Sequence, residues 1–205
     1  MIDQTYLEFV YGEKPAFLPS ISTLNYSKLI HIFSFSKSFG MPGWRVGFTL
    51  VPKPLTSSLR KVQDAHPTHA AIASQILAKQ CLAINTHTMA TTGKSWIQHK
   101  VDSLVVVREA IWDIVARLGT VLTSGAFYFL IPLPPCVSED EAIQLFVDCS
   151  SILLMHGRAF GAPGYLRLSY GSIPPDRVLS ACDKLNCGVD KLLQQSHHRA
   201  AQVHH

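Results

Sequence analysis

Hydrophobic positions in the first part of the chain fall into short uninterrupted runs. Residues 30–34 and 46–51 are mostly apolar, rich in β-branched and aromatic side chains, and bounded by polar or Gly/Pro segments. Such runs predict buried strands. The pattern then becomes helical, because apolar residues recur on one face of residues 94–118. Gly119 follows this face and is expected to end a long amphipathic helix.

Two further helices are predicted between the second strand and this long helix. Residues 54–64 carry a proline early in the segment, where a helix tolerates it. Residues 68–84 are rich in alanine, and Thr68 is placed to cap them.

The remainder of the chain alternates between strand and helix patterns. Ser138 is followed three residues later by Glu141, which predicts a capping box at the start of a helix. From Ser196 the chain is polar and rich in histidine, so we expect a frayed tail. The predicted order is strand, helix, strand, strand, helix over residues 121–131, 138–151, 152–155, 165–170 and 175–193. This order is typical of a compact α+β unit.

Composition supports a folded chain and limits its partners. The 205 residues are 47% hydrophobic and 16% charged. Soluble domains average about 25% charged residues, so we expect another subunit to cover part of the surface. The net charge of +4 is scattered, without a basic stripe. Nucleic acid is therefore not an expected partner.

Composition and the first residues also bear on location. No apolar run approaches the roughly 20 residues of a membrane-spanning helix. The first residues lack the pattern of a secretory signal. Neither a membrane partner nor secretion is expected, and the cytoplasm is the predicted location. The 5 cysteines show no CxxC spacing, which predicts reduced thiols and no metal site.

The densest candidate chemistry lies between the first two predicted strands, in residues 34–48. Ser34 and Ser36 precede Lys37, three glycines follow, and Arg45 stands eight residues after the lysine. Hydroxyls and a guanidinium bind phosphate oxygens, and glycines let the backbone approach a ligand closely. An amine beside such an anion site is suited to attack an aldehyde.

The S-x-S-K sequence followed by Arg45 resembles the pyridoxal-phosphate attachment site of class I/II aminotransferases, which have the fold-type-I architecture. The resemblance implies that Lys37 forms a Schiff base with pyridoxal 5'-phosphate and moves a proton at the substrate α-carbon. It also implies that Ser34, Ser36 and Arg45 hold the phosphate.

Two further elements match the same family. Asp3 and Tyr6 resemble its D-x-x-Y element, in which the Asp pairs with the pyridine nitrogen and the Tyr with the phenolic oxygen of the cofactor. The segment from Gly157 through Phe160 to Arg167 resembles its late Gly, Phe-Gly and Arg element. There Arg167 would bind the substrate α-carboxylate. Other readings are an N-cap for Asp3, a core position for Tyr6 and a surface ion pair for Arg167.

The resemblance defines an α/β fold class. Residues 1–93 are expected to be the carboxy-terminal part of a large cofactor-binding domain, with a mixed, mostly parallel sheet and helices. Residues 94–195 would form a linking helix and a small α+β domain, followed by a flexible His-rich tail over residues 196–205. The family's earlier segments are not expected in this chain, so the sequence predicts an amino-terminally truncated member.

The implied activity is transfer of an amino group between an α-amino acid and a 2-oxo acid, by a cytoplasmic homodimer with a biosynthetic role in amino-acid metabolism. A pyridoxal-phosphate-dependent lyase of the same fold is one alternative. A non-catalytic truncated paralogue or fragment that pairs with a longer subunit is another.

Overall fold

The computed structural model describes residues 1–12 and 29–203. They divide into two compact units, Met1–Asp102 and Ser103–His205, each with its own sheet. Helix α4 (Trp96–Val115) contains the boundary between the units. Each unit is described separately below.

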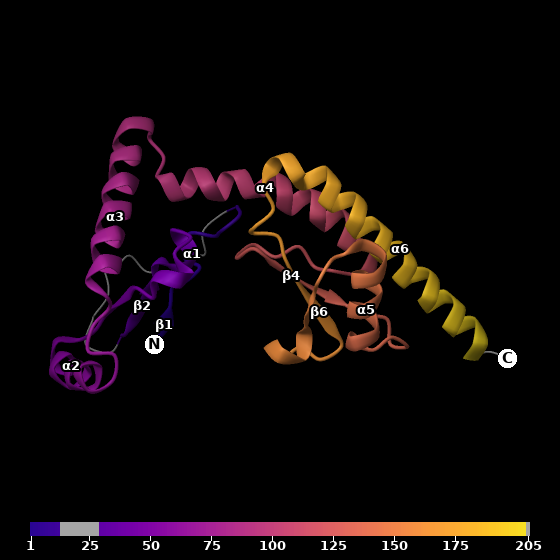
Figure 1. Cartoon of the computed structure of the whole chain (residues 1–205), viewed down its shortest axis with the longest axis horizontal. Helices are drawn as coiled ribbons and strands as arrows, with labels where there is room; N and C mark the ends of the chain where they lie inside the picture. Colours follow the sequence, from indigo (N-terminus) through magenta and orange to yellow (C-terminus); the bar gives the residue numbers. More distant parts are fainter. Residues whose placement is uncertain (13–28, 204–205) are drawn as a thin grey trace. The chain divides into compact units, whose positions relative to one another are not determined.

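The first unit is built on a mixed sheet with the order β1-β2-β3 (Figure 1). Strands β1 (Ile2–Asp3) and β2 (His31–Ser34) are parallel, and β3 (Gly47–Leu50) runs antiparallel to β2. The two strands predicted from the apolar runs are therefore present. The expectation that both are buried is wrong for β3, where three of four residues are exposed. In β2 it holds for His31 alone, since the other three residues are half-buried. In the described part of the chain β3 forms one edge of the sheet, so it is paired on one side only.

Helices α2 (Thr56–Ala65) and α3 (Ile72–Thr92) follow, after the short turn η4 (Lys53–Leu55). Thr68 does not cap α3, because its backbone is left-handed (φ 58°) and the helix begins four residues later. The helix also continues beyond residue 84, where the alanine-rich pattern ends. Its last turns contain threonines whose hydroxyls donate hydrogen bonds to backbone carbonyls of the preceding turn. Thr88, for example, donates to the carbonyl of Ile84.

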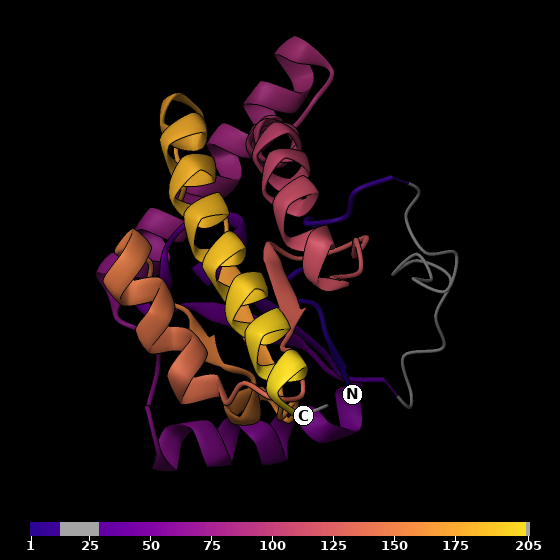
Figure 2. The ribbon, with the colours of Figure 1, turned by 90° about the vertical axis from the view of Figure 1, so that its right-hand side faces the viewer.

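The second unit packs helices against one face of an antiparallel sheet with the order β4-β6-β5. Its strands are β4 (Tyr128–Pro132), β5 (Met155–His156) and β6 (Tyr165–Ser169). Helices α5 (Glu139–Ser150) and α6 (Val178–Val203) lie side by side, as Figure 2 shows. Short turns complete the unit: η5 (Ala116–Leu118), η6 (Gly157–Phe160) and η7 (Pro175–Arg177).

The core of the second unit follows the alternation expected of a half-covered sheet. On β4, Phe129 and Ile131 are fully buried, whereas Leu130 between them is 43% exposed. On β6, Leu166 and Leu168 face the same core. Arg167 lies between these two leucines on β6, so its side chain is directed to the opposite face of the sheet.

Three local expectations for this unit can be compared with the structure. The capping box is present, since Ser138 and Glu141 bond reciprocally. The strand predicted from residue 121 begins only at Tyr128, after Ala126 adopts a left-handed backbone (φ 61°) that extended chain does not allow. The expected tail is helical through Val203, and Arg199 ties it to Glu141 with Nη2 3.0 Å from Oε1.

Among the described residues, no helix combines the length and apolar character that crossing a membrane requires.

Candidate functional site

Two parallel strands bring Asp3 and Ser34 to the same edge of the first sheet. Asp3 ends β1 and lies opposite Ile32, and Ser34 ends β2. Parallel strands direct their carboxyl ends to one edge, where α/β proteins place ligands. The Asp3 carboxylate accepts hydrogen bonds from the Thr5 hydroxyl at 2.6 Å and the Thr5 backbone N–H at 2.9 Å. These bonds lower the pKa of Asp3, so the group is ionised at neutral pH.

Lys37 lies on helix α1 (Phe35–Ser38), a single turn that begins directly after β2. Ser34 caps this turn, because its Oγ accepts the backbone N–H of Ser36 at 3.1 Å. Phe35 anchors the turn in the small core of the first unit, together with Met41 and Val46. The predicted attachment lysine is therefore half-buried. It lies on a turn that is capped by Ser34 and anchored in the core by Phe35.

Arg45 closes the same segment, after the short turn η3 (Pro42–Trp44). Its backbone is left-handed (φ 50°), which is uncommon for a residue with a side chain. Its Nη1 donates to the carbonyl of Pro42 at 2.9 Å. The backbone N–H of Phe35 donates to the carbonyl of Val46 at 3.3 Å, which joins the two ends of the segment. Strained residues of this kind often serve a binding site.

Tyr6 lies in the turn after β1 and is half-buried. Its ring meets Phe9 edge-on, with the centroids 6.1 Å apart. Asp3, Tyr6, Ser34, Ser36, Lys37 and Arg45 all belong to the first unit, and Arg167 belongs to the second.

Arg167 lies on β6, the central strand of the second sheet. Its guanidinium carbon is 3.8 Å from the ring centroid of Phe160 and 4.6 Å from that of Tyr128. Nη2 lies 2.9 Å from the sulfur of Met155. Within the described part of the chain Arg167 has no carboxylate partner, so the surface ion pair considered above is not what the structure shows. Arginine between two aromatic rings is held in place while its charge stays uncompensated.

The loop that carries Phe160 is fastened to the start of α5. The buried carboxylate of Glu139 accepts the backbone N–H of Gly164 at 2.9 Å and that of Arg158 at 3.3 Å. Burial acts to raise the pKa of Glu139, but these two bonds together with the positive charges of Arg158 and His156 outweigh it, and the pKa is lowered. Asp140 adds an ion pair to Arg158 at 2.8 Å.

Comparison with known proteins identifies the family. Residues 1–185 match the family model for aminotransferase class I and II. The chain belongs to the class I and II aminotransferases. It is similar to the aromatic aminotransferase ISS1 of Arabidopsis thaliana, with 32% identity over 201 residues that cover 94% of this chain and 48% of that protein. An aspartate aminotransferase of Thermotoga maritima is 24% identical over 185 residues, which cover 89% of this chain and 45% of that protein.

A solved structure gives the fold. The aromatic aminotransferase from Pyrococcus horikoshii OT3 superposes with a TM-score of 0.76 and 23% identity, over 92% of this chain and 50% of that chain. The fold is thus that of the fold-type-I aminotransferases, an α/β architecture. The chain spans about half the length of the curated relatives it matches. Members of this family generally depend on pyridoxal phosphate.

Sequence reasoning named Arg167 but missed the side chains that hold it. Phe160 and Tyr128 come from separate segments, and only the fold brings them to the same guanidinium. Glu139 was likewise missed, because its partners lie 19 and 25 residues away. The late Phe-Gly sequence was the one available indication, and it did not say what the phenylalanine touches.

Proposed function

We propose that this chain carries the part of a pyridoxal-phosphate site that includes the attachment lysine, Lys37. We propose further that it acts in amino-group transfer between an α-amino acid and a 2-oxo acid. The observation that supports this is the arrangement of Asp3, Ser34 and Lys37 at one edge of the first sheet. The proposal includes the cytoplasm as location, a homodimer as assembly and a biosynthetic role in amino-acid metabolism.

The donors in the first unit fit the cofactor chemically. An ionised carboxylate such as Asp3 suits a protonated ring nitrogen, and the guanidinium of Arg45 suits a phosphate. The hydroxyls of Ser34 and Ser36 add phosphate donors, and Tyr6 would donate to the phenolic oxygen. When bound, pyridoxal phosphate would supply an electron sink for the substrate α-carbon.

The protein side of the reaction then divides among these residues. Asp3 would keep a proton on the ring nitrogen. The Lys37 amine would hold the cofactor until the substrate amine displaces it, and the freed amine would then take and return the proton at the substrate α-carbon. Arg167 binds the α-carboxylate with its two-pronged guanidinium, which would make an α-amino acid the substrate class.

Cofactor attachment tests the proposal directly. The purified chain is incubated with pyridoxal phosphate, reduced with borohydride and mapped by peptide mass spectrometry. We expect the label at Lys37 and visible absorbance before reduction. Lys37→Ala removes both, whereas Lys53→Ala, which changes an exposed lysine of the same unit, keeps both. Equal labelling of wild type and Lys37→Ala would overturn the assignment.

Product analysis then identifies the reaction. Amino-group transfer releases a 2-oxo acid and passes the amino group to a second oxo acid, whereas a lyase releases ammonia. Attachment at Lys37 without either product would instead assign the chain a binding role.

A further inference from the structure

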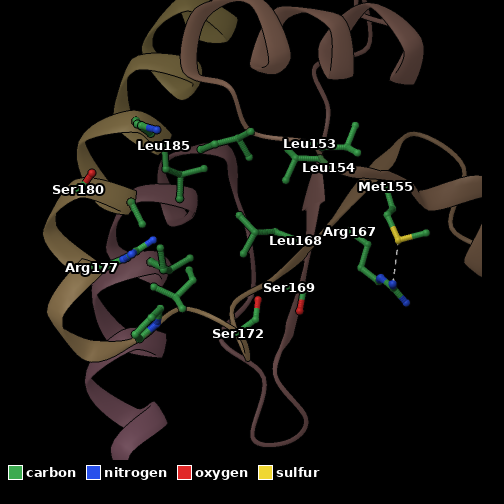
Figure 3. A pocket seen from close by; sticks show the side chains of 16 residues that line it. Leu153, Leu154, Met155, Arg167, Leu168, Ser169, Ser172, Arg177, Ser180 and Leu185 are labelled. Carbon is green, nitrogen blue, oxygen red and sulfur yellow. Dashed lines mark hydrogen bonds between the residues drawn. The ribbon is translucent and has the colours of Figure 1, made fainter. Parts of the chain in front are cut away.

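The second unit contains an open pocket of about 650 Å³ between β5, β6 and the start of α6 (Figure 3). Pockets of 300–1,000 Å³ are the usual size for small-molecule sites. Its lining is largely apolar. Leu154, Leu168 and Leu185 line it but are buried in the core of the unit, whereas Leu153 and Met155 are 79% and 46% exposed. Exposed apolar surface of this kind is available to a ligand with an apolar body.

Basic and hydroxyl side chains line one end of the pocket. Arg177 ends η7, and Ser180 and Lys184 follow in the first turns of α6. Spacings of three and four residues place the three side chains along one face. Ser169 and Ser172 line the same pocket from the end of β6 and the loop after it, and lie close together in Figure 3.

The charge of this end is positive and uncompensated. No Asp or Glu is among the described residues that line the pocket. Asp176 and Asp183 neighbour the two cations in sequence but lie outside the lining. In the described part of the chain neither Arg177 nor Lys184 forms an ion pair. An anionic group would therefore meet hydroxyl donors and two cations without a competing carboxylate.

These basic side chains are separate from Arg167, the proposed ligand of the substrate α-carboxylate. Arg167 lies at the other side of the pocket, where its guanidinium is engaged by Met155, Phe160 and Tyr128. Arg177 and Lys184 take no part in that arrangement.

We propose that this pocket binds a small carboxylate with an apolar body, its carboxylate at Arg177, Ser180 and Lys184 and its body against the exposed side chains of Leu153 and Met155. The site does not depend on the cofactor site, because every residue in it belongs to the second unit.

Titration with 3-phenylpropionate tests the site on the full chain without added cofactor. Amide resonances in NMR spectra should shift at the start of α6 and around Ser169 and Ser172. The neutral analogue 3-phenylpropanol should bind at least ten-fold more weakly. Equal binding of acid and alcohol, or shifts confined to residues outside the pocket, would overturn the proposal.

Variants distinguish the contribution of the two cations to binding from that of the pocket wall. Arg177→Gln and Lys184→Gln should each weaken binding about two- to five-fold, the range for single exposed charge pairs. Lys191→Gln changes an exposed lysine on the same helix outside the pocket and should leave binding unchanged. Ala181→Met places a larger side chain at the wall and should abolish binding while the far-ultraviolet circular dichroism stays native.

A second copy of the chain is the competing occupant. If 3-phenylpropionate does not bind and Ala181→Met shifts the sedimentation coefficient, the pocket is an interface and the small-molecule proposal is wrong.

Discussion

The phenyl ring of Phe160 covers the guanidinium of Arg167, with the guanidinium carbon 3.8 Å from the ring centroid. The ring of Tyr128 also contacts the guanidinium, at 4.6 Å. Both rings orient the cation without neutralising it. The orientation of the proposed α-carboxylate clamp therefore depends on residues that need not touch the substrate.

Phe160→Leu is expected to weaken binding of a 2-oxo acid such as pyruvate by about two- to thirty-fold, because a cation–π contact is worth about 0.5–2 kcal/mol. Phe160→Tyr keeps an aromatic face and should retain most of the affinity. Isothermal titration of the two variants and of wild type measures the difference. If leucine serves as well as tyrosine, the ring does not position the guanidinium.

Gly157→Ala is expected to destabilise the second unit by at least about 2 kcal/mol, the range of severe steric substitutions. A Cβ at Gly157 would lie 2.2 Å from the carbonyl oxygen of Ala162 and 2.4 Å from that of Tyr165, so the backbone must move. Gly43→Ala is the matched control, since its Cβ would meet no atom within 4 Å. Urea unfolding compares them, and equal midpoints would contradict the packing described for this loop.

The capping box should make stability depend on acid pH. Hydrogen bonds from Arg199 and Ser138 lower the pKa of Glu141 from 4.5 to about 2. A carboxyl whose pKa is lower in the folded state stabilises the fold above its unfolded pKa. This contribution should therefore be full above pH 4.5 and be lost as the pH falls toward about 2.

Glu141→Gln should flatten this part of the pH profile, measured as thermal midpoints between pH 6 and pH 2. Glu109→Gln is a control on α4, whose carboxylate takes no part in the capping box. A variant profile that parallels wild type would show that Glu141 does not carry the effect.

Ile131→Ala is expected to cost about 2–5 kcal/mol of unfolding free energy, because the side chain is fully buried. Its neighbour Leu130 is 43% exposed, so Leu130→Ala should cost far less. Chemical unfolding of the two variants checks the alternation along β4. Equal losses would mean that both faces of the second sheet are covered in solution.

The sequence predicted most of what depends on local patterns. Apolar runs located β2 and β3, and the capping box located the start of α5 at its observed residue. The lysine segment could be singled out because its hydroxyls, glycines and arginine are close in sequence, and its role as a cofactor site stays a prediction.

What the sequence could not supply depended on distant contacts. The one-turn helix that carries Lys37 forms because Phe35 is buried and Ser34 caps it, and neither follows from periodicity over four residues. The extension of α6 to Val203 is accompanied by the bond of Arg199 to Glu141 across 58 residues. The same is true of the rings around Arg167.

Glu139 supports the surroundings of Arg167 although it does not contact Arg167 itself. Its carboxylate holds the amides of Arg158 and Gly164, on either side of Phe160. The first residue of α5 thus holds a loop that lies 19 to 25 residues further along the chain. Through that loop it also positions the ring of Phe160 beside Arg167. Substitution of Glu139 should therefore disturb this loop and the ring beside Arg167 together, and libraries aimed at the proposed substrate site have reason to include this residue.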